Sequence, residues 1–160
     1  MPTSLIIVDD FLGVRDAQQF RQTALGLTYP DLQGAFPGRN SLERLEIDGL
    51  SDAASRIVGE RLKPVSPPQS HAKFRITLAN DVGRAKVHVD SAHWSGILYL
   101  SAPEDCQGGT EFFRHRPTGT DRAPFNDEEI AKMGFSSREA MYQQLIERDG
   151  TDDSKWEMTM

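Results

Sequence analysis

Apolar residues recur every three to four positions in four stretches of the chain, which is the spacing of one face of an α-helix. The first stretch covers residues 14–25 and the second covers residues 50–62. Two further stretches follow at 128–133 and at 136–146. The last of them opens with Ser136-Ser137-Arg138-Glu139, which has the form of a helix-capping box. The pattern therefore predicts four helices that flank the middle of the chain.

The middle of the chain has a different pattern, in which short apolar runs alternate with turn residues. Such runs predict short antiparallel strands in a meander, as found in sandwiches and jelly rolls. The predicted strands cover residues 72–78, 85–90, 97–101 and 110–115. A buried strand is also predicted at 5–8 and another strand at 155–160, while residues 29–41 are predicted as loop. The predicted fold class is α+β, with a β core over residues 72–116 and the helices outside it.

Composition and charge narrow the class of protein. A chain of 160 residues fits one domain, residues 1–160, and no repeat or linker divides it. The net charge of −6 disfavours a nucleic-acid surface, which needs clustered Lys and Arg. No apolar run reaches the length of a membrane span, the first residues lack the basic start of a signal peptide, and the single Cys106 can form no disulfide within the chain. We therefore expect a cytoplasmic protein with no nucleic-acid or membrane partner.

One short motif carries the candidate chemistry. Lys86-Val87-His88-Val89-Asp90 ends a predicted strand. Side chains alternate between the two faces of a strand, so His88 and Asp90 are expected to point the same way. An imidazole and a carboxylate side by side can bind one divalent metal ion, and a second histidine would complete the facial triad of a non-heme iron oxygenase. A surface histidine that hydrogen-bonds a carboxylate has the same pattern, so the neighbouring motifs decide between the two interpretations.

Two further motifs follow along the chain. Ile97-Leu98-Tyr99-Leu100 is an aliphatic strand, and Gly108-Gly109-Thr110-Glu111-Phe112 opens the next one. Together with His88-Val89-Asp90 they resemble the core of the 2-oxoglutarate- and Fe(II)-dependent dioxygenases, nearest the prolyl-hydroxylase-like branch and a group of uncharacterised bacterial proteins within it. The resemblance covers residues 4–116 and implies a double-stranded β-helix (a jelly-roll or cupin-like fold) with His88 and Asp90 as iron ligands.

The resemblance also implies an activity. Members of this family use Fe(II) and 2-oxoglutarate to hydroxylate a substrate with O2, so this chain would be an oxidoreductase, a dioxygenase. Its substrate would be a small molecule or a peptide that the sequence does not identify. Trp94, Tyr99 and Phe112 are candidates for the wall of the pocket, although aromatic residues on strands are more often part of a core.

The chain departs from the family in its last third. The family supplies a second ligand histidine near the end of the roll, whereas no histidine follows His115 here. The sequence therefore predicts a roll that lacks its closing strands, with a third iron ligand that is either absent or supplied by His93 or His115. Each histidine also has a simpler interpretation: His93 as a loop residue beside Trp94, and His115 as an exposed residue between Arg114 and Arg116.

The acidic cosubstrate needs a basic anchor as well. Arg75, Arg84 and Arg114 are the candidates, because guanidinium binds a carboxylate through two hydrogen bonds. Arg75 is the one we assign to the pocket, although an arginine in such a position is more often an ordinary surface charge.

Other classes of function stay open at this point. The missing histidine favours, as an alternative, a degenerate cupin-like domain that binds a metal ion or small molecule, or another protein, without catalysis. A metal-dependent isomerase or hydrolase on the same roll is a third interpretation. A roll without its closing strands exposes unpaired edges, so we expect a homodimer formed through such an edge.

Overall fold

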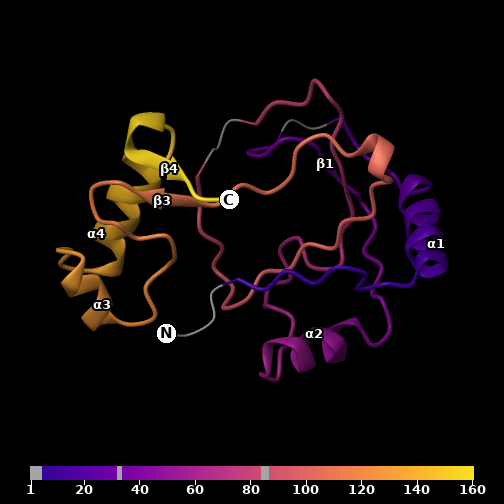
Figure 1. Cartoon of the computed structure of the whole chain (residues 1–160), viewed down its shortest axis with the longest axis horizontal. Coiled ribbons are helices and arrows are strands. Elements are labelled where there is room, and N and C mark those ends of the chain that lie inside the picture. Colours follow the sequence, from indigo (N-terminus) through magenta and orange to yellow (C-terminus); the bar gives the residue numbers. More distant parts are fainter. Residues whose placement is uncertain (1–4, 32–33, 84–86) are drawn as a thin grey trace. The chain divides into compact units, whose positions relative to one another are not determined.

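The structure is a computed structural model, and it describes residues 5–31, 34–83 and 87–160. The chain forms two compact units (Figure 1). The first unit consists of Met1–Val82 and Gly96–Cys106, and the second consists of Gly83–Ser95 and Gln107–Met160. Each unit is therefore built from two separate lengths of the chain.

The first unit holds two of the predicted helices. Helix α1 (Val14–Leu25) has the bounds that the sequence predicts. Helix α2 (Leu50–Val58) begins where predicted but ends before residue 62, because Gly59 adopts a left-handed conformation with φ of 73°. Glycine takes this conformation without steric cost, and it commonly ends helices. A short 3-10 helix, η1 (Pro103–Asp105), completes the helical part of this unit.

The small sheet of the first unit includes a segment predicted as loop. Strand β1 (Arg39–Asn40) runs antiparallel to β2 (Arg75–Ile76). Gly38 permits this approach, because a Cβ at that position would lie 2.5 Å from a carbonyl oxygen of β2. The predicted pairing of residues 72–78 with 85–90 is therefore wrong for β2, and residues 84–86 lie outside the part of the chain that the structure describes.

The second unit holds the remaining predicted helices, with a π-helical continuation. Its elements are β3 (Phe113–His115), α3 (Asp127–Lys132), α4 (Arg138–Tyr142), the π-helix η2 (Gln143–Arg148), the 3-10 helix η3 (Asp153–Lys155) and β4 (Trp156–Met158). The N-cap of α4 is Ser137, whose hydroxyl accepts a hydrogen bond from the Ala140 amide at 3.1 Å. The capping signal in the sequence was therefore correct to within one residue.

The hydrophobic core of the second unit is formed by its helices. Ile130 of α3, Met141 of α4 and Leu145 of η2 are buried against one another, and Ile130 is 2% exposed. Three half-buried side chains pack around this cluster: Met133, Phe135 and Ile146. Apolar residues at helical spacing thus bury one face of each helix, as their periodicity predicts.

Strands β3 and β4 form a second antiparallel pair, with Phe113 opposite Met158 and His115 opposite Trp156. The predicted strands at 110–115 and 155–160 are therefore present in shortened form. Trp156 is buried and Met158 is exposed, so the strand buries only its first residue. The two-stranded pairs and the helices together confirm an α+β fold class.

The predicted β core over residues 72–116 is wrong for the residues that the structure describes. Residues 97–101 form no strand, and Tyr99 is 57% exposed. Residues 5–8, predicted as a buried strand, form no strand either and are exposed. Short apolar runs predict burial only where another element covers them, and the apolar faces of α3, α4 and η2 cover one another instead.

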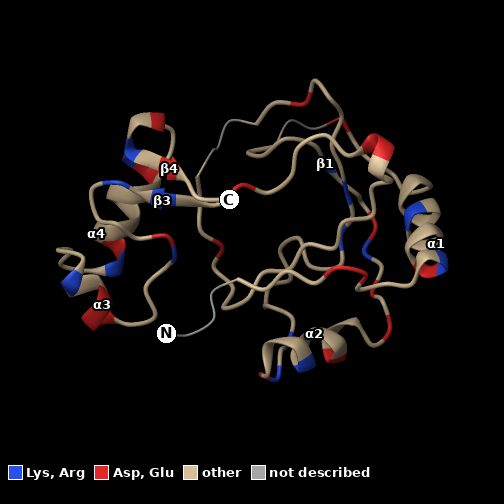
Figure 2. Cartoon of the chain, in the orientation of Figure 1, with Lys and Arg blue, Asp and Glu red and all other residues tan. Residues whose placement is uncertain are grey.

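Charged residues of both signs are spread over both units (Figure 2). Helix α3 shows an ordered pattern, with Asp127, Glu128 and Glu129 in its first turn and Lys132 in its last. This arrangement complements the helix dipole. No helix in the described ranges combines the length and apolar character needed to cross a membrane.

Candidate functional site

His88 and Asp90 lie close together in the second unit. The Nε2 atom of His88 is 3.6 Å from Oδ1 of Asp90. The two side chains are 44% and 53% exposed, so both can be reached from solvent. Residues 87–90, here named the ligand segment, form no regular strand, so the short distance between the two side chains, and not strand alternation, places them together. The segment thus presents one imidazole and one carboxylate together.

This geometry suits two neighbouring ligands of one metal ion. Metal–nitrogen and metal–oxygen bonds of about 2.1 Å set two adjacent ligand atoms about 3 Å apart. The observed 3.6 Å is within a small side-chain rotation of that separation. Among the described residues, no group of three or more His, Cys, Asp or Glu side chains gathers in a way that could hold a metal ion. The structure therefore brings together the two predicted ligands, and the third ligand stays a prediction.

The N-terminal end of the ligand segment is fixed by a backbone contact from the end of η2. The Val87 amide donates a hydrogen bond to the carbonyl of Gly150 at 3.1 Å. Gly150 is buried, and a Cβ on it would collide with the carbonyl oxygen of Ile146 and lie 3.1 Å from that of Val87. The close approach of the segment to this turn therefore requires a residue without a side chain.

An aromatic group lies just beyond the segment. The ring of His93 meets Trp94 edge-on, with centroids 6.2 Å apart, and Phe125 at 6.3 Å. The guanidinium of Arg122 lies over the ring of Phe125, 4.4 Å from its centroid. This is a cation–π arrangement. Trp94 is half-buried, and its indole nitrogen has no hydrogen-bond partner among the described residues. His93 is therefore next to aromatic rings, as its simpler interpretation expects.

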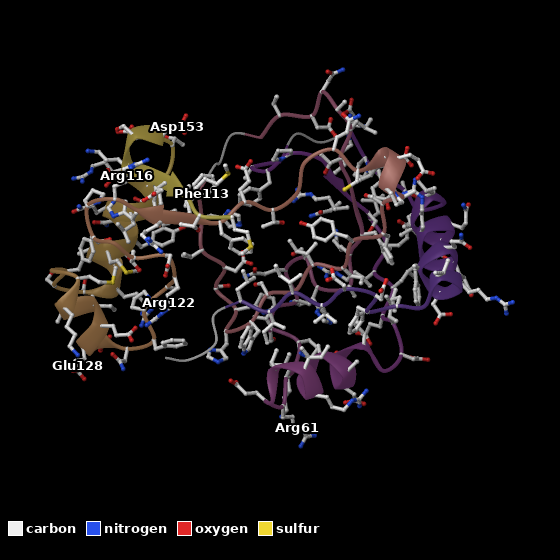
Figure 3. The ribbon with its side chains drawn as sticks, viewed as in Figure 1. Arg61, Phe113, Arg116, Arg122, Glu128 and Asp153 are labelled. Atoms are coloured by element: carbon white, nitrogen blue, oxygen red, sulfur yellow. The ribbon has the colours of Figure 1, made fainter. Side chains whose placement is uncertain are left out.

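Arg122, labelled in Figure 3, is itself held by Glu129 of α3. Its two terminal nitrogens each donate to an oxygen of Glu129, both at 2.9 Å. These hydrogen bonds from Arg122, together with the donation from the Phe125 amide, lower the pKa of Glu129 to about 2. The pair ties the loop before α3 to the first turn of the helix.

His115 is buried, contrary to the expectation of an exposed residue in a basic cluster. It is 0% exposed, with Nε2 3.2 Å from Oδ2 of Asp149 and Nδ1 3.0 Å from the hydroxyl of Thr118. Its ring lies 4.8 Å from that of Trp156. Because both ring nitrogens already have partners, a metal ion could bind His115 only by displacing one of them. The neighbouring charges in the sequence suggested exposure, but pairing β3 with β4 turns this residue inward.

Asp149 was not anticipated from the sequence. Its carboxylate accepts hydrogen bonds from Arg148 at 2.9 Å and contacts His115, and its carbonyl accepts one from the Trp156 indole at 2.8 Å. The bond from Arg148, followed by that from His115, lowers the pKa of Asp149. An Asp-Gly pair after a helix signals only a turn, and its histidine partner is distant in sequence, so no local pattern identifies the pair.

The remaining predicted pocket residues are divided between the units. Arg75 and Tyr99 belong to the first unit, while Trp94 and Phe112 belong to the second with the ligand segment. Arg75 is exposed on β2. Phe112 is exposed at its side chain, and its backbone exchanges hydrogen bonds with residues 159 and 160. That these four residues line one pocket stays a prediction.

Arg84 and Arg114 are the two other arginines considered for binding the carboxylate of the cosubstrate. Arg114 lies 3.3 Å from the carboxylate of Asp121, which gives it a protein partner on the surface. Arg84 lies outside the described residues.

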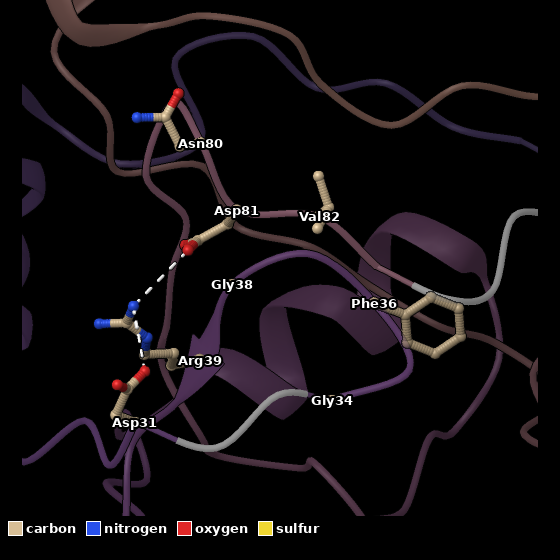
Figure 4. A pocket seen from close by; sticks show the side chains of 8 residues that line it. All are labelled: Asp31, Gly34, Phe36, Gly38, Arg39, Asn80, Asp81 and Val82. Carbon is tan, nitrogen blue, oxygen red and sulfur yellow. Dashed lines mark ion pairs between the residues drawn. The ribbon is translucent and has the colours of Figure 1, made fainter.

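A small pocket of about 90 Å³ is present in the first unit (Figure 4). Arg39 crosses it between two carboxylates, 3.3 Å from Asp31 and 3.6 Å from Asp81. The pocket is lined by Asp31, Gly34, Phe36, Gly38, Arg39, Asn80, Asp81 and Val82. Ligand pockets for organic molecules usually exceed about 300 Å³, so this one has room for water molecules only, and its cation is already paired.

Comparisons with known proteins give no independent assignment. No protein-family model, no curated protein and no solved structure matches the chain.

Proposed function

We propose that this chain is an oxygenase-like protein that binds Fe(II) through His88 and Asp90 and uses 2-oxoglutarate as its cosubstrate. The observation that carries the proposal is the 3.6 Å separation of an imidazole nitrogen and a carboxylate oxygen, both open to solvent. The motif resemblance supplies the identity of the metal and the cosubstrate. The reaction would hydroxylate a small molecule or a peptide.

The donor set fits a divalent iron ion. His88 offers an imidazole nitrogen and Asp90 a carboxylate oxygen, a combination that non-heme iron sites use. When bound, Fe(II) and 2-oxoglutarate supply the oxidative chemistry. The protein's own part is to hold the two ligand atoms on one side of the segment and to leave the other side open for cosubstrate and substrate. Asp90 also contributes the negative charge that offsets part of the charge of the ion.

The finer fold belongs to the same proposal. A double-stranded β-helix over residues 1–160 is what the motif order implies, and the antiparallel pairing of β3 with β4 is compatible with one turn of such a roll. A cytoplasmic location and a homodimer formed through an unpaired edge complete the proposal.

The same two residues also support the alternative function, a cupin-like domain that binds a metal ion without turnover. Two ligands are enough for weak binding of a divalent ion, with water at the remaining positions. The alternative therefore shares the metal site with the oxygenase and differs in the use of 2-oxoglutarate.

Anaerobic titration with Fe(II), followed by 2-oxoglutarate, separates these functions. An oxygenase site gives a weak visible charge-transfer band when both are bound, and His88→Ala abolishes it while changing stability little. His71→Ala, which changes a histidine of the first unit, is the matched control and leaves the band intact. Iron binding without the band favours the cupin-like alternative. Absence of iron binding by the unaltered chain overturns both.

A further inference from the structure

We propose that Gly150 is a positioning residue for the metal site, whose carbonyl sets the direction in which His88 points. This inference rests on the proposed function, because it assigns a role relative to the metal ligands. It concerns a backbone group in a turn distant in sequence from the ligand segment, and all of its contacts lie within the second unit.

The first step is the contact itself. The hydrogen bond from the Val87 amide to the Gly150 carbonyl, 3.1 Å long, ends on the residue directly before His88. This hydrogen bond fixes the peptide plane that ends at the Cα of Val87, one residue before His88. The next peptide plane leads to the Cα of His88, and its carbonyl oxygen also lies against the turn, 3.1 Å from where a Cβ on Gly150 would stand. Asp90 is two residues further along, so the same bond constrains it less.

The second step is the rigidity of the turn that carries the carbonyl. Leu145 anchors η2 in the hydrophobic core, and Asp149 at its end is buried. The Asp149 side chain is held by Arg148 and His115, and its carbonyl by the indole of Trp156. The residue next to Gly150 is therefore bonded from a helix, from β3 and from β4. The hydrogen bond from Val87 to this turn therefore holds the start of the ligand segment in a fixed position relative to the turn.

The third step is the requirement for glycine. A Cβ at Gly150 would meet the carbonyl oxygen of Ile146 and would lie 3.1 Å from that of Val87. Any side chain must therefore push the ligand segment away from the turn or distort the end of η2. Residues that orient metal ligands typically change metal affinity by about 10–100-fold when altered.

The test measures Mn(II) binding by the full chain, using the decrease of the free-ion electron paramagnetic resonance signal. Gly150→Ala is expected to weaken binding at least tenfold, within the range of about 10–100-fold known for residues that orient ligands. Met141→Ala is the matched control, because it removes buried volume from the hydrophobic core of the same unit and leaves Gly150 and Val87 unaltered. It is expected to lower stability and to leave the affinity of the folded protein unchanged.

A second variant guards against a general loss of structure. Val87→Pro removes the donor of the hydrogen bond and leaves the turn at Gly150 unaltered. It is expected to weaken Mn(II) binding to a similar extent. In both variants the amide of Arg116, which donates to the Lys155 carbonyl, is expected to stay protected from hydrogen exchange, which shows that β3 and β4 remain paired.

Measurements without metal separate this inference from the proposed function. In the unaltered chain the Val87 amide is expected to exchange slowly and the His88 ring to show a nuclear Overhauser effect to Asp90; both are expected to be lost in Gly150→Ala. If the unaltered chain binds no Mn(II), the proposed function fails, and these two signals alone decide the positioning role. Unchanged signals, or unchanged Mn(II) affinity in a variant whose Val87 amide exchanges freely, overturn the positioning role and leave the metal site standing.

Discussion

Four hydrophobic side chains are buried among the described residues, and all four belong to the second unit: Ile130, Met141, Leu145 and Trp156. In the first unit the described apolar side chains are half-buried or exposed, and polar contacts connect its segments. Arg44 donates to the carbonyls of Pro68, Gln69 and His71. Arg21 binds Asp105 of η1 at 2.5 Å. The second unit thus has a buried apolar core, whereas hydrogen bonds and ion pairs, several of them from arginine, connect the segments of the first.

The difference between the units matters for the proposed metal site. Burial of apolar surface contributes more to stability than exposed ion pairs do, because solvent screens the latter. The ligand segment hydrogen-bonds to the unit that has the hydrophobic core. A site that must hold two ligand atoms within tenths of an ångström is better served by that unit.

The largest expected effect tests the core directly. Ile130→Ala removes a fully buried side chain and is expected to lower the free energy of unfolding by about 2–5 kcal/mol. The same change at Ile57 of α2, which is exposed, is expected to cost about 0.5 kcal/mol or less. Denaturant unfolding followed by far-ultraviolet circular dichroism measures both losses, because each unit contains helices. Equal losses would remove the contrast between the units.

A smaller effect is expected from the arginine contacts of the first unit. Arg44→Ala leaves three backbone carbonyls without their charged donor, and we expect a local loss of about 1–2 kcal/mol, reduced by solvent because the site is exposed. Hydrogen exchange at the Leu45 amide, which donates to Ala72, is the readout. Arg61→Ala, at an exposed position after α2, is the control (Figure 3). If Leu45 exchanges alike in both variants, polar contacts do not hold this unit.

The smallest expected effect is on the free energy of unfolding at acidic pH. The pKa of Glu129 is lowered from 4.5 to about 2 by its bonds to Arg122, so its contribution is fully present above pH 4.5 and is lost as the pH falls toward 2. Glu129→Gln is expected to flatten this part of the pH–stability profile. Glu128→Gln, which changes an exposed residue of the same helix, is expected to leave it unchanged. A profile that keeps its slope in Glu129→Gln would show that the ion pair contributes nothing.

The sequence predicted elements well where local periodicity decides them. Helix α1 has its predicted bounds. His88 and Asp90 lie close together as expected, although the strand on which that expectation rested is absent at residues 87–90. The partner of β2 was missed, because β1 lies in a stretch whose glycines and prolines indicate a loop. The pairing of His115 with Asp149 was missed for a related reason, since it depends on where β3 meets β4. Contacts between residues far apart in the sequence leave no periodic signal. They account for most of the differences between the predicted and the observed structure.

The division of each unit into two lengths of chain has a consequence for biosynthesis. On the ribosome, the chain that forms the first unit is complete once Cys106 has been made. The ligand segment is made earlier still, whereas the turn at Gly150 and strand β4 are made only after the first unit is complete. During that interval His88 and Asp90 are synthesised but not yet oriented. The orientation of these two side chains therefore depends on residues of the second unit that are made well after the ligand segment itself.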